Sequence, residues 1–165
     1  MIVTIVSEGA CDAKLPLAER LASRRRQAGR KVLLMDADSA PHVHPPSLVA
    51  ATCISGKGVG PELENLGQRF EDIVVDADGR DSLGSRAALI AAGVVVVPAH
   101  EVHGDPARAA RLADRIGNAR LFNPALRIVI VPCDGCAAFA ILAQCLPGAE
   151  LPANDDALYA SVFRQ

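Results

Sequence analysis

The sequence predicts a three-layer α/β domain with a mostly parallel sheet. Five short apolar runs alternate with longer segments of helical character, which favours right-handed crossovers between parallel strands. Half of the 165 residues are hydrophobic, yet the chain has no Trp, one Tyr and four Phe. A core of Val, Leu, Ile and Ala suits a sheet that is buried on both faces. The length predicts a single domain over residues 1–165.

Each expected strand corresponds to one of these runs. The first is the β-branched run at the start of the chain, and the fourth contains four consecutive valines. The strands are expected at 2–6, 31–36, 72–76, 94–98 and 127–132. A stretch at 39–60 is rich in Pro, Gly, Ser and His and is predicted to be loop-rich.

The helices are expected between the strands and after the last one. They lie near 14–28, 60–69, 82–92, 105–119, 136–145 and 155–163. Ligands in parallel α/β sheets bind beyond the carboxyl ends of the strands. The loops that follow the five strands should therefore meet at one edge, and any site should lie there.

The segment after the first strand has the parts of a phosphate-binding loop. A strand, a loop of small residues, a lysine and a helix follow one another, and such loops hold phosphates with backbone N–H groups. The full pattern is G-x-x-x-x-G-K-[ST]. Gly9 and Lys14 fit it, but Ala13 stands at the second glycine and Leu15 at the hydroxyl that should hold Mg²⁺.

Together with the second strand, this loop resembles the ParA/MinD family of deviant-Walker P-loop ATPases, which partition plasmids and position division proteins. The second strand ends in Asp36 and Asp38, which match the D-x-D of the family. The run at 70–76 is similar to the family's Walker B strand, and Asp76 takes the place of its Mg²⁺-associated Asp. The resemblance covers roughly residues 1–40 and 70–165.

The loop departs from the family pattern K-G-G-x-G-K-[ST]-[ST]. When Lys14 is placed on the P-loop lysine, Gly9 occupies the position of the signature lysine and Asp12 the variable position. A nucleotide site implied by the resemblance would consist of Gly9, Asp12, Ala13, Lys14, Leu15 and Asp76, with Asp36 and Asp38 as vestigial catalytic residues.

These departures bear on the cofactor. Backbone amides turn toward phosphates most readily at glycines, and Mg²⁺ carries much of phosphoryl-transfer catalysis. We therefore expect no cofactor, or ATP with Mg²⁺ if the loop is still competent. Enzymatic activity is left open and leans toward none, and an enzyme would be an ATPase. Alternatively, Lys14 is an exposed helix lysine and Asp36 and Asp38 are solvated or bonded to the adjoining loop.

The cysteines offer a second kind of site. Cys133 and Cys136 form a C-x-x-C pair, and His100 and His103 lie on a loop expected at the same sheet edge. Such residues would suit a metal or redox module. The alternative is that the thiols are small buried groups and the histidines lie on the surface.

Arginines form two basic strips in a chain of formal net charge −2. Each strip is either a solvated helix face or a surface for nonspecific DNA binding, which the resemblance implies. They are Arg20, Arg24, Arg25 and Arg26 on the first helix, and Arg108, Arg111 and Arg115 on a later one. No apolar run is long enough for a membrane span, and residues 1–6 do not continue as a signal peptide, so we expect a cytoplasmic protein.

The leading functional expectation is a degenerate ParA-like protein of DNA segregation, plasmid partition or conjugative transfer. It would act mainly through a protein partner, with weak or absent ATP hydrolysis, and would form a homodimer if it follows the family. One alternative is a genuine deviant-Walker ATPase that binds Mg·ATP as a nucleotide-dependent dimer. The other is the metal or redox module of Cys133 and Cys136.

Overall fold

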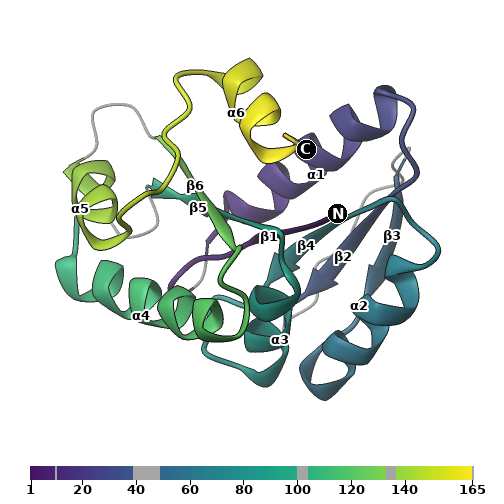
Figure 1. The fold of residues 1–165 in the computed structure, drawn as a ribbon, viewed down its shortest axis with the longest axis horizontal. Coiled ribbons are helices and arrows are strands. Elements are labelled where there is room, and N and C mark those ends of the chain that lie inside the picture. The colour runs from purple at the N-terminus through teal and green to yellow at the C-terminus, as the bar shows by residue number, and fades with distance from the viewer. Residues whose placement is uncertain (10, 39–48, 100–103, 133–136, 165) are drawn as a thin grey trace.

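The computed structural model describes residues 1–9, 11–38, 49–99, 104–132 and 137–164. The described strands form one parallel sheet in the order β3-β2-β4-β1-β5-β6, with helices on both faces (Figure 1). The strands are β1 Ile2–Ile5, β2 Val32–Ala37, β3 Ala50–Cys53, β4 Asp72–Ala77, β5 Val94–Pro98 and β6 Arg127–Val131. The helices are α1 Lys14–Gln27, the 3₁₀ helix η1 Gly56–Gly58, α2 Val59–Gly67, α3 Leu83–Ala91, α4 Pro106–Phe122, α5 Ala137–Cys145 and α6 Asp155–Val162. The predicted three-layer α/β class is confirmed.

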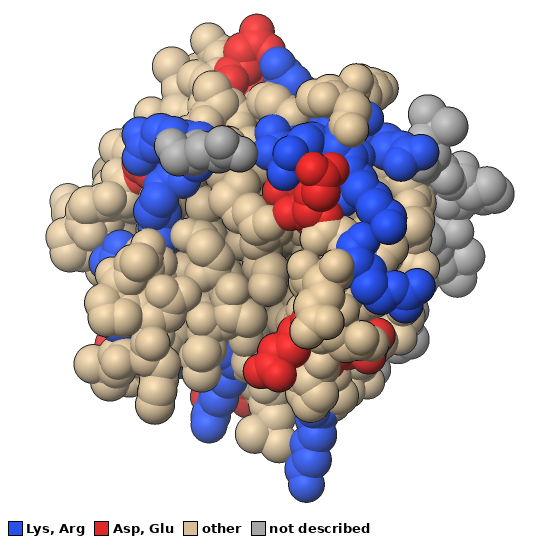
Figure 2. All heavy atoms as spheres, turned by 45° about the vertical axis from the view of Figure 1, so that its right-hand side comes forward, with Lys and Arg blue, Asp and Glu red and all other residues tan. Residues whose placement is uncertain are grey.

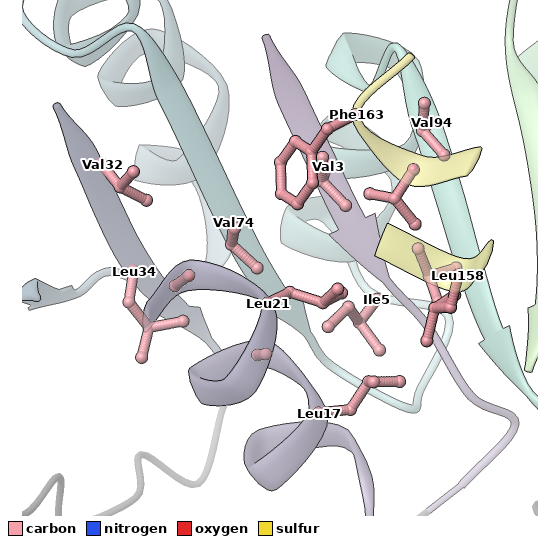
Figure 3. Packing of buried hydrophobic residues seen from close by; sticks show 14 of the residues in the cluster. Val3, Ile5, Leu17, Leu21, Val32, Leu34, Val74, Val94, Leu158 and Phe163 are labelled. Carbon is pink, nitrogen blue, oxygen red and sulfur yellow. The ribbon is translucent and has the colours of Figure 1, made fainter. Parts of the chain in front are cut away.

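Two helical layers enclose the sheet. Helices α1 and α6 cover one face, and α2, α3, α4 and α5 cover the other (Figure 1). On the first face, Leu17 and Leu21 of α1 and Leu158 of α6 pack on Ile5 and Val74 (Figure 3). Full burial of one such side chain contributes about 1.5–3 kcal/mol to the free energy of unfolding. This packing holds α1 on the sheet and so fixes the position of the loop that leads into it.

Strand β3 lies inside the stretch that the sequence suggested was loop-rich. It pairs in parallel with β2, with Leu33 opposite Ala50 and Asp36 opposite Cys53. Three of its four residues are exposed, because β3 is an edge strand of the sheet. Its sequence, Ala-Ala-Thr-Cys, therefore lacks the apolar run that marks the interior strands. Residues 50–53 of that stretch are therefore a strand and residues 56–60 are helical, while residues 39–48 lie outside the described part of the chain.

The order of the strands determines where a ligand site can form. Strands β1 and β4 are neighbours, and Ile5 lies opposite Asp76 at their carboxyl ends. The chain leaves β1 toward α1 on one face, and it leaves β4 toward α3 on the other face (Figure 1). Loops that diverge in this way leave a crevice between them, and ligands of open α/β sheets bind in such crevices.

No helix among the described residues is both long enough and apolar enough to cross a membrane.

The opposite edge of the sheet carries a buried ionic cluster around Asp72 at the start of β4. Nε of Arg25 donates to its carboxylate at 2.7 Å, and Nε of Arg30 donates at 3.2 Å. Burial acts to raise the pKa of Asp72, but the hydrogen bonds from Arg25 and Arg30 and the charge of Arg25 outweigh it. The pKa of Asp72 is therefore held below its ordinary value, and the cluster ties α1 to the sheet.

The Asp72 cluster makes the free energy of unfolding depend on pH in the acid range. The pKa of Asp72 is lower in the folded state than in the unfolded state. Its contribution to the free energy of unfolding is therefore complete above the unfolded-state pKa of about 3.9, and it is lost as the pH falls through the folded-state pKa. We expect the free energy of unfolding to fall with pH below about 4, and to fall less steeply in Asp72→Asn. Urea denaturation across a pH series measures both slopes. Parallel curves for the two proteins would contradict this assignment.

Candidate functional site

A pocket of about 540 Å³ opens at the carboxyl ends of β1, β2 and β4. It lies in the crevice that the topology predicts, between the loop before α1 and the loop after β4. It is lined by Gly9, Cys11, Asp12, Lys14, Leu15, Pro16, Asp38, Asp78, Gly79 and Arg80. Five of these residues were predicted from the sequence, namely Gly9, Asp12, Lys14, Leu15 and Asp38. Asp78, Gly79 and Arg80 were not predicted as site residues, although Asp-Gly directly after a buried strand is a recognisable turn signal.

Lys14 is the first residue of α1 and its side chain is buried, with only 2% of the residue exposed. Its Nζ lies 3.1 Å from Oδ1 of Asp76 and 3.5 Å from Oδ2 of Asp38, and it donates a hydrogen bond to the carbonyl oxygen of Ala77. The alternative that Lys14 is an exposed helix lysine is therefore wrong. The ammonium group serves as the counter-ion of the carboxylates that end β2 and β4.

The three candidate carboxylates meet at this point. Asp36 and Asp76 lie opposite each other in neighbouring strands, and both are fully buried. The backbone N–H of Asp38 donates to Oδ1 of Asp36 at 3.0 Å, so Asp36 is bonded to the adjoining loop and is not solvated. Buried carboxylates need positive charge or hydrogen bonds to stay ionised. Lys14 supplies positive charge beside Asp76 and Asp38.

The thiol of Cys53 lies at the end of β3, opposite Asp36. Desolvation raises the pKa of Cys53, and the negative charge of Asp36 raises it further. Thiolates are the reactive and metal-binding form of cysteine, so this thiol is poorly suited to either role.

The loop before α1 is in direct contact with the loop after β4. The N–H of Gly9 donates to the carbonyl oxygen of Gly79 at 2.8 Å, and Oγ of Ser7 donates to the carbonyl oxygen of Gly9 at 2.8 Å. Gly9 has φ = +96°, a conformation that favours glycine. A Cβ on Gly79 would lie 1.8 Å from the Gly9 oxygen, so only glycine allows this approach.

Three arginines of α4 contact the loop before α1, and Arg115 also contacts the loop after β4. Nη2 of Arg108 donates to the carbonyl oxygen of Glu8 at 2.5 Å, and Nε of Arg111 donates to Oε1 of Glu8 at 2.8 Å. Arg115 is the most buried of the three, with 8% of its side chain exposed. Its guanidinium donates to Glu8 Oε2, Ser85 Oγ and the carbonyl oxygens of Ser7, Asp78, Gly79 and Arg80. The spacing of these arginines predicted that they share one helix face, but not that they bond to the loops of the site.

Arg115→Met should loosen both loops. The substitution leaves several part-buried carbonyl oxygens without their charged donor, and we expect a loss of about 2–3 kcal/mol in the free energy of unfolding. The amide of Gly9 should also exchange its hydrogen faster. Arg111→Met is the matched control, since 56% of that side chain is exposed and, among the described residues, it pairs with Glu8, so a loss below about 1 kcal/mol is expected. Denaturation and hydrogen exchange measure both effects, and equal losses in the two variants would contradict the assignment.

The arginines of α1 also pair within the chain. Arg20 and Arg24 form ion pairs with Asp155 and Asp156 of α6, at 3.2 and 2.6 Å, and Arg25 pairs with Asp72. On the face shown in Figure 2, acidic side chains lie among the basic ones. Arg26 is exposed. Most of the first basic strip therefore joins α1 to α6 and to the sheet.

We tested whether the pocket fits Mg·ATP. The first turn of α1 offers few N–H groups to a phosphate, because the N–H groups of Lys14 and Leu17 donate to backbone carbonyls and Pro16 has none. Leu15 brings no hydroxyl for a metal, and the single lysine is already paired with two carboxylates. Asp12, Asp38 and Asp78 add negative charge to the lining. The pocket has the position expected for a nucleotide. Its described lining departs from the full phosphate-binding motif in these donors, and Arg80 adds one further positive group.

The metal or redox alternative involves residues that the structure does not describe. Cys133, Cys136, His100 and His103 all lie outside the described ranges. Within those ranges, no group of three or more His, Cys, Asp or Glu side chains is placed to hold a metal ion.

Comparison with known proteins shows which solved structures share this fold. No family model and no curated protein matches the chain, whereas solved structures resemble it. MinD, a cell division protein of Aquifex aeolicus, gives a TM-score of 0.64 at 15% identity, covering 99% of this chain and 86% of MinD. Apo McdA of Cyanothece gives 0.63 at 14% identity, covering 96% and 88%. Cobyrinic acid a,c-diamide synthase from Mycobacterium smegmatis, with bound ADP and magnesium, gives 0.62 at 15% identity, covering 87% and 80%.

The likeness to these structures shows that the chain has the three-layer α/β fold of P-loop NTPases. Within that class the chain has the fold of the ParA/MinD-type ATPases, as the sequence resemblance implied. Identities of 14–15% establish the likeness at the level of the fold. The function of this chain must therefore be argued from its own residues.

Proposed function

We propose that this chain is a degenerate ParA/MinD-like protein that acts through contacts with a protein partner, with ATP hydrolysis weak or absent. The observation that carries the proposal is the burial of Lys14 between Asp76 and Asp38. A lysine in that position can reach a phosphate only by giving up its ion pairs with Asp76 and Asp38. In this proposal the lysine of the phosphate-binding loop forms an internal ion pair and does not bind a phosphate.

A role in DNA segregation, plasmid partition or conjugative transfer follows from the resemblance of the sequence to ParA proteins. A protein partner agrees with one of the solved structures of this fold, the MinC:MinD cell division complex of Aquifex aeolicus. Nonspecific DNA binding is the weaker part of the proposal. Arg20, Arg24 and Arg25 pair with acidic side chains, and Arg108, Arg111 and Arg115 with Glu8 or backbone oxygens.

A genuine ATPase is the second candidate, and one observation favours it. The pocket lies at the carboxyl ends of β1 and β4 and has about 540 Å³, which is in the range of ligand sites. A mycobacterial synthase of the same fold has been solved with an ATP analogue and magnesium. If Lys14 left Asp76 and Asp38 when nucleotide arrived, the pocket would be available.

ATP hydrolysis separates the two candidates. Phosphate release by the natural protein should not exceed the background of the assay. A restored loop carrying Ala10→Gly, Cys11→Gly, Ala13→Gly and Leu15→Thr supplies the missing glycines and hydroxyl and serves as a comparison. Turnover by the natural protein that is lost in Lys14→Ala, with the fold retained by circular dichroism, would refute the proposal. Turnover by the restored loop alone would support it.

A further inference from the structure

An apolar hollow opens at the amino edge of the sheet, where the strands begin, which is the edge opposite the candidate site. It has about 350 Å³ and lies between the ends of α2 and α3 and the starts of β1 and β4. Met1, Ile2, Phe70 and Ala91 are among its lining residues, and no charged side chain of the described chain lines it. The hollow and the larger pocket share no lining residue, so a ligand bound here would not compete for that site.

The hollow continues into a groove between α2 and α3. An adjoining hollow of about 300 Å³ shares Ile2 and Ala91 with the first and extends between the two helices to Leu63 and Ile90. These helices lie side by side on one face of the sheet (Figure 1). Volumes of this size are in the range of sites that hold a ligand, so the groove has room for apolar side chains of a partner.

Two positive side chains lie beside the apolar lining. Nζ of Lys31 lies 5.3 Å from the centre of the Phe70 ring, a distance at which a cation is attracted to the ring face. Arg69 directly precedes Phe70 in the chain, and both Arg69 and Lys31 are exposed. Within the described ranges neither of them forms an ion pair, so we call them the two free cations.

The neighbouring carboxylates are matched by other arginines. Nη1 of Arg30 lies 2.8 Å from Glu71, and Nε of Arg25 donates to Asp72 at 2.7 Å. Glu71 also accepts the backbone N–H of Lys31 at 2.7 Å. Each of these two carboxylates already has an arginine partner. The two free cations therefore add surplus positive charge at this end of the groove, in a chain whose formal net charge is −2.

Charge and lining together indicate the chemistry of the partner. A nucleic acid would gain from the two free cations, but it would gain nothing from the apolar lining, and it would meet Glu64, an exposed residue that lines the adjoining hollow. A peptide with apolar side chains next to acidic ones gains from both features. Protein contacts commonly combine an apolar centre with a polar rim in this way.

We propose that the α2–α3 groove binds a short segment of a partner protein in which apolar side chains stand next to Asp or Glu. The apolar side chains enter the two hollows, and the acidic ones pair with Lys31 and Arg69. This inference rests on the proposed function, because it gives the expected protein partner a surface. It does not depend on whether the nucleotide pocket is occupied, since the groove and that pocket share no lining residue.

A nuclear magnetic resonance titration with a synthetic peptide tests the proposal. The probe is a capped peptide of about ten residues with Leu and Phe in one half and Asp and Glu in the other, added without nucleotide. The amide signals of Phe70 and Ala91 should shift saturably, with a dissociation constant on the order of 10–500 μM. Lys31→Glu and Arg69→Glu should each raise that constant at least about fivefold. Arg26→Glu is the matched control, because Arg26 is an exposed cation of α1, on the other face of the sheet, and it should leave the constant unchanged.

Two further changes separate the apolar contribution from the charged one. A peptide with Asn and Gln in place of its acidic residues should bind more weakly, and Lys31→Glu should then weaken it no further, because residues in contact are coupled in such cycles. Ala91→Asp places a charge in the wall that the two hollows share and should abolish binding. Ala110→Asp, on an exposed position of α4, should not.

Several results would overturn the proposal. These are the absence of saturable shifts at about 2 mM peptide, shifts confined to other parts of the chain, and equal weakening by Arg26→Glu and Lys31→Glu. A DNA duplex of about 20 base pairs that shifts the same signals at lower concentration than the peptide would assign the two free cations to nucleic acid and would also overturn it. None of these results depends on ATP hydrolysis, so a failure here is distinct from a failure of the proposed function.

Discussion

Lys14→Met is expected to lower the free energy of unfolding by about 3–5 kcal/mol, which is the usual cost of removing one partner from a buried ion pair. Met has a volume similar to that of Lys, so the loss measures the removal of the charge and not the formation of a cavity. Asp76 is fully buried and lies 3.1 Å from the ammonium group. Without Lys14, its carboxylate must stay charged in the interior or take up a proton.

A second substitution separates the ion pair from a packing defect. Lys14→Met with Asp76→Asn removes the lysine and one of the carboxylates that it neutralises, so the double variant should recover more than half of the loss. Residues in contact commonly show coupling of about 0.5–3 kcal/mol in such cycles. Lys57→Met is the control, since Lys57 is exposed in η1, and it should change stability by less than about 0.5 kcal/mol. Chemical denaturation of the natural protein, Lys14→Met, Asp76→Asn, the double variant and the Lys57→Met control gives the result. Strictly additive losses would contradict the role of Lys14.

Gly79→Ala is expected to be the next most damaging change, with a loss of about 3 kcal/mol in the free energy of unfolding. The added Cβ would lie 1.8 Å from the oxygen of Gly9 and 2.5 Å from its carbonyl carbon. Both are backbone atoms and cannot rotate away as a flexible side chain would. The hydrogen bond from the Gly9 N–H to Gly79 would break, and the two loops of the site would separate.

Gly117→Ala is the matched control for this change. Gly117 lies within α4, and a Cβ there would meet nothing within 4 Å. Alanine is a better helix former than glycine by about 1 kcal/mol, so this variant should be slightly more stable than the natural protein. Thermal unfolding distinguishes the opposite signs. Equal shifts in the two variants would show that the contact between Gly9 and Gly79 does not hold the loops.

The fold could be predicted because the interior strands are buried on both faces. Runs such as the four valines of β5 are the direct signature of that burial. Strand β3 escaped prediction because an exposed edge position does not demand apolar residues. Its pairing with β2 depends on backbone contacts, which leave little trace in the sequence.

The site could be predicted in place but not in detail. Topology alone brings Asp36, Asp76 and the loop with Lys14 to one edge of the sheet. The sequence could not show whether the lysine turns toward the pocket or toward the carboxylates. Nor could it show that Arg108 and Arg115, spaced for one helix face, meet Glu8 about a hundred residues earlier in the chain.

Titration calorimetry of Mg·ATP into the natural protein is the most direct measurement of whether the phosphate cradle has become an internal ion pair. The ion pairs of Lys14 with Asp76 and Asp38 predict no saturable heat with nucleotide concentrations up to the millimolar range, and no rise in the melting temperature. Binding in the micromolar range that is abolished in Lys14→Ala, while that variant keeps its fold and stability, would contradict the assignment and make Lys14 a phosphate ligand.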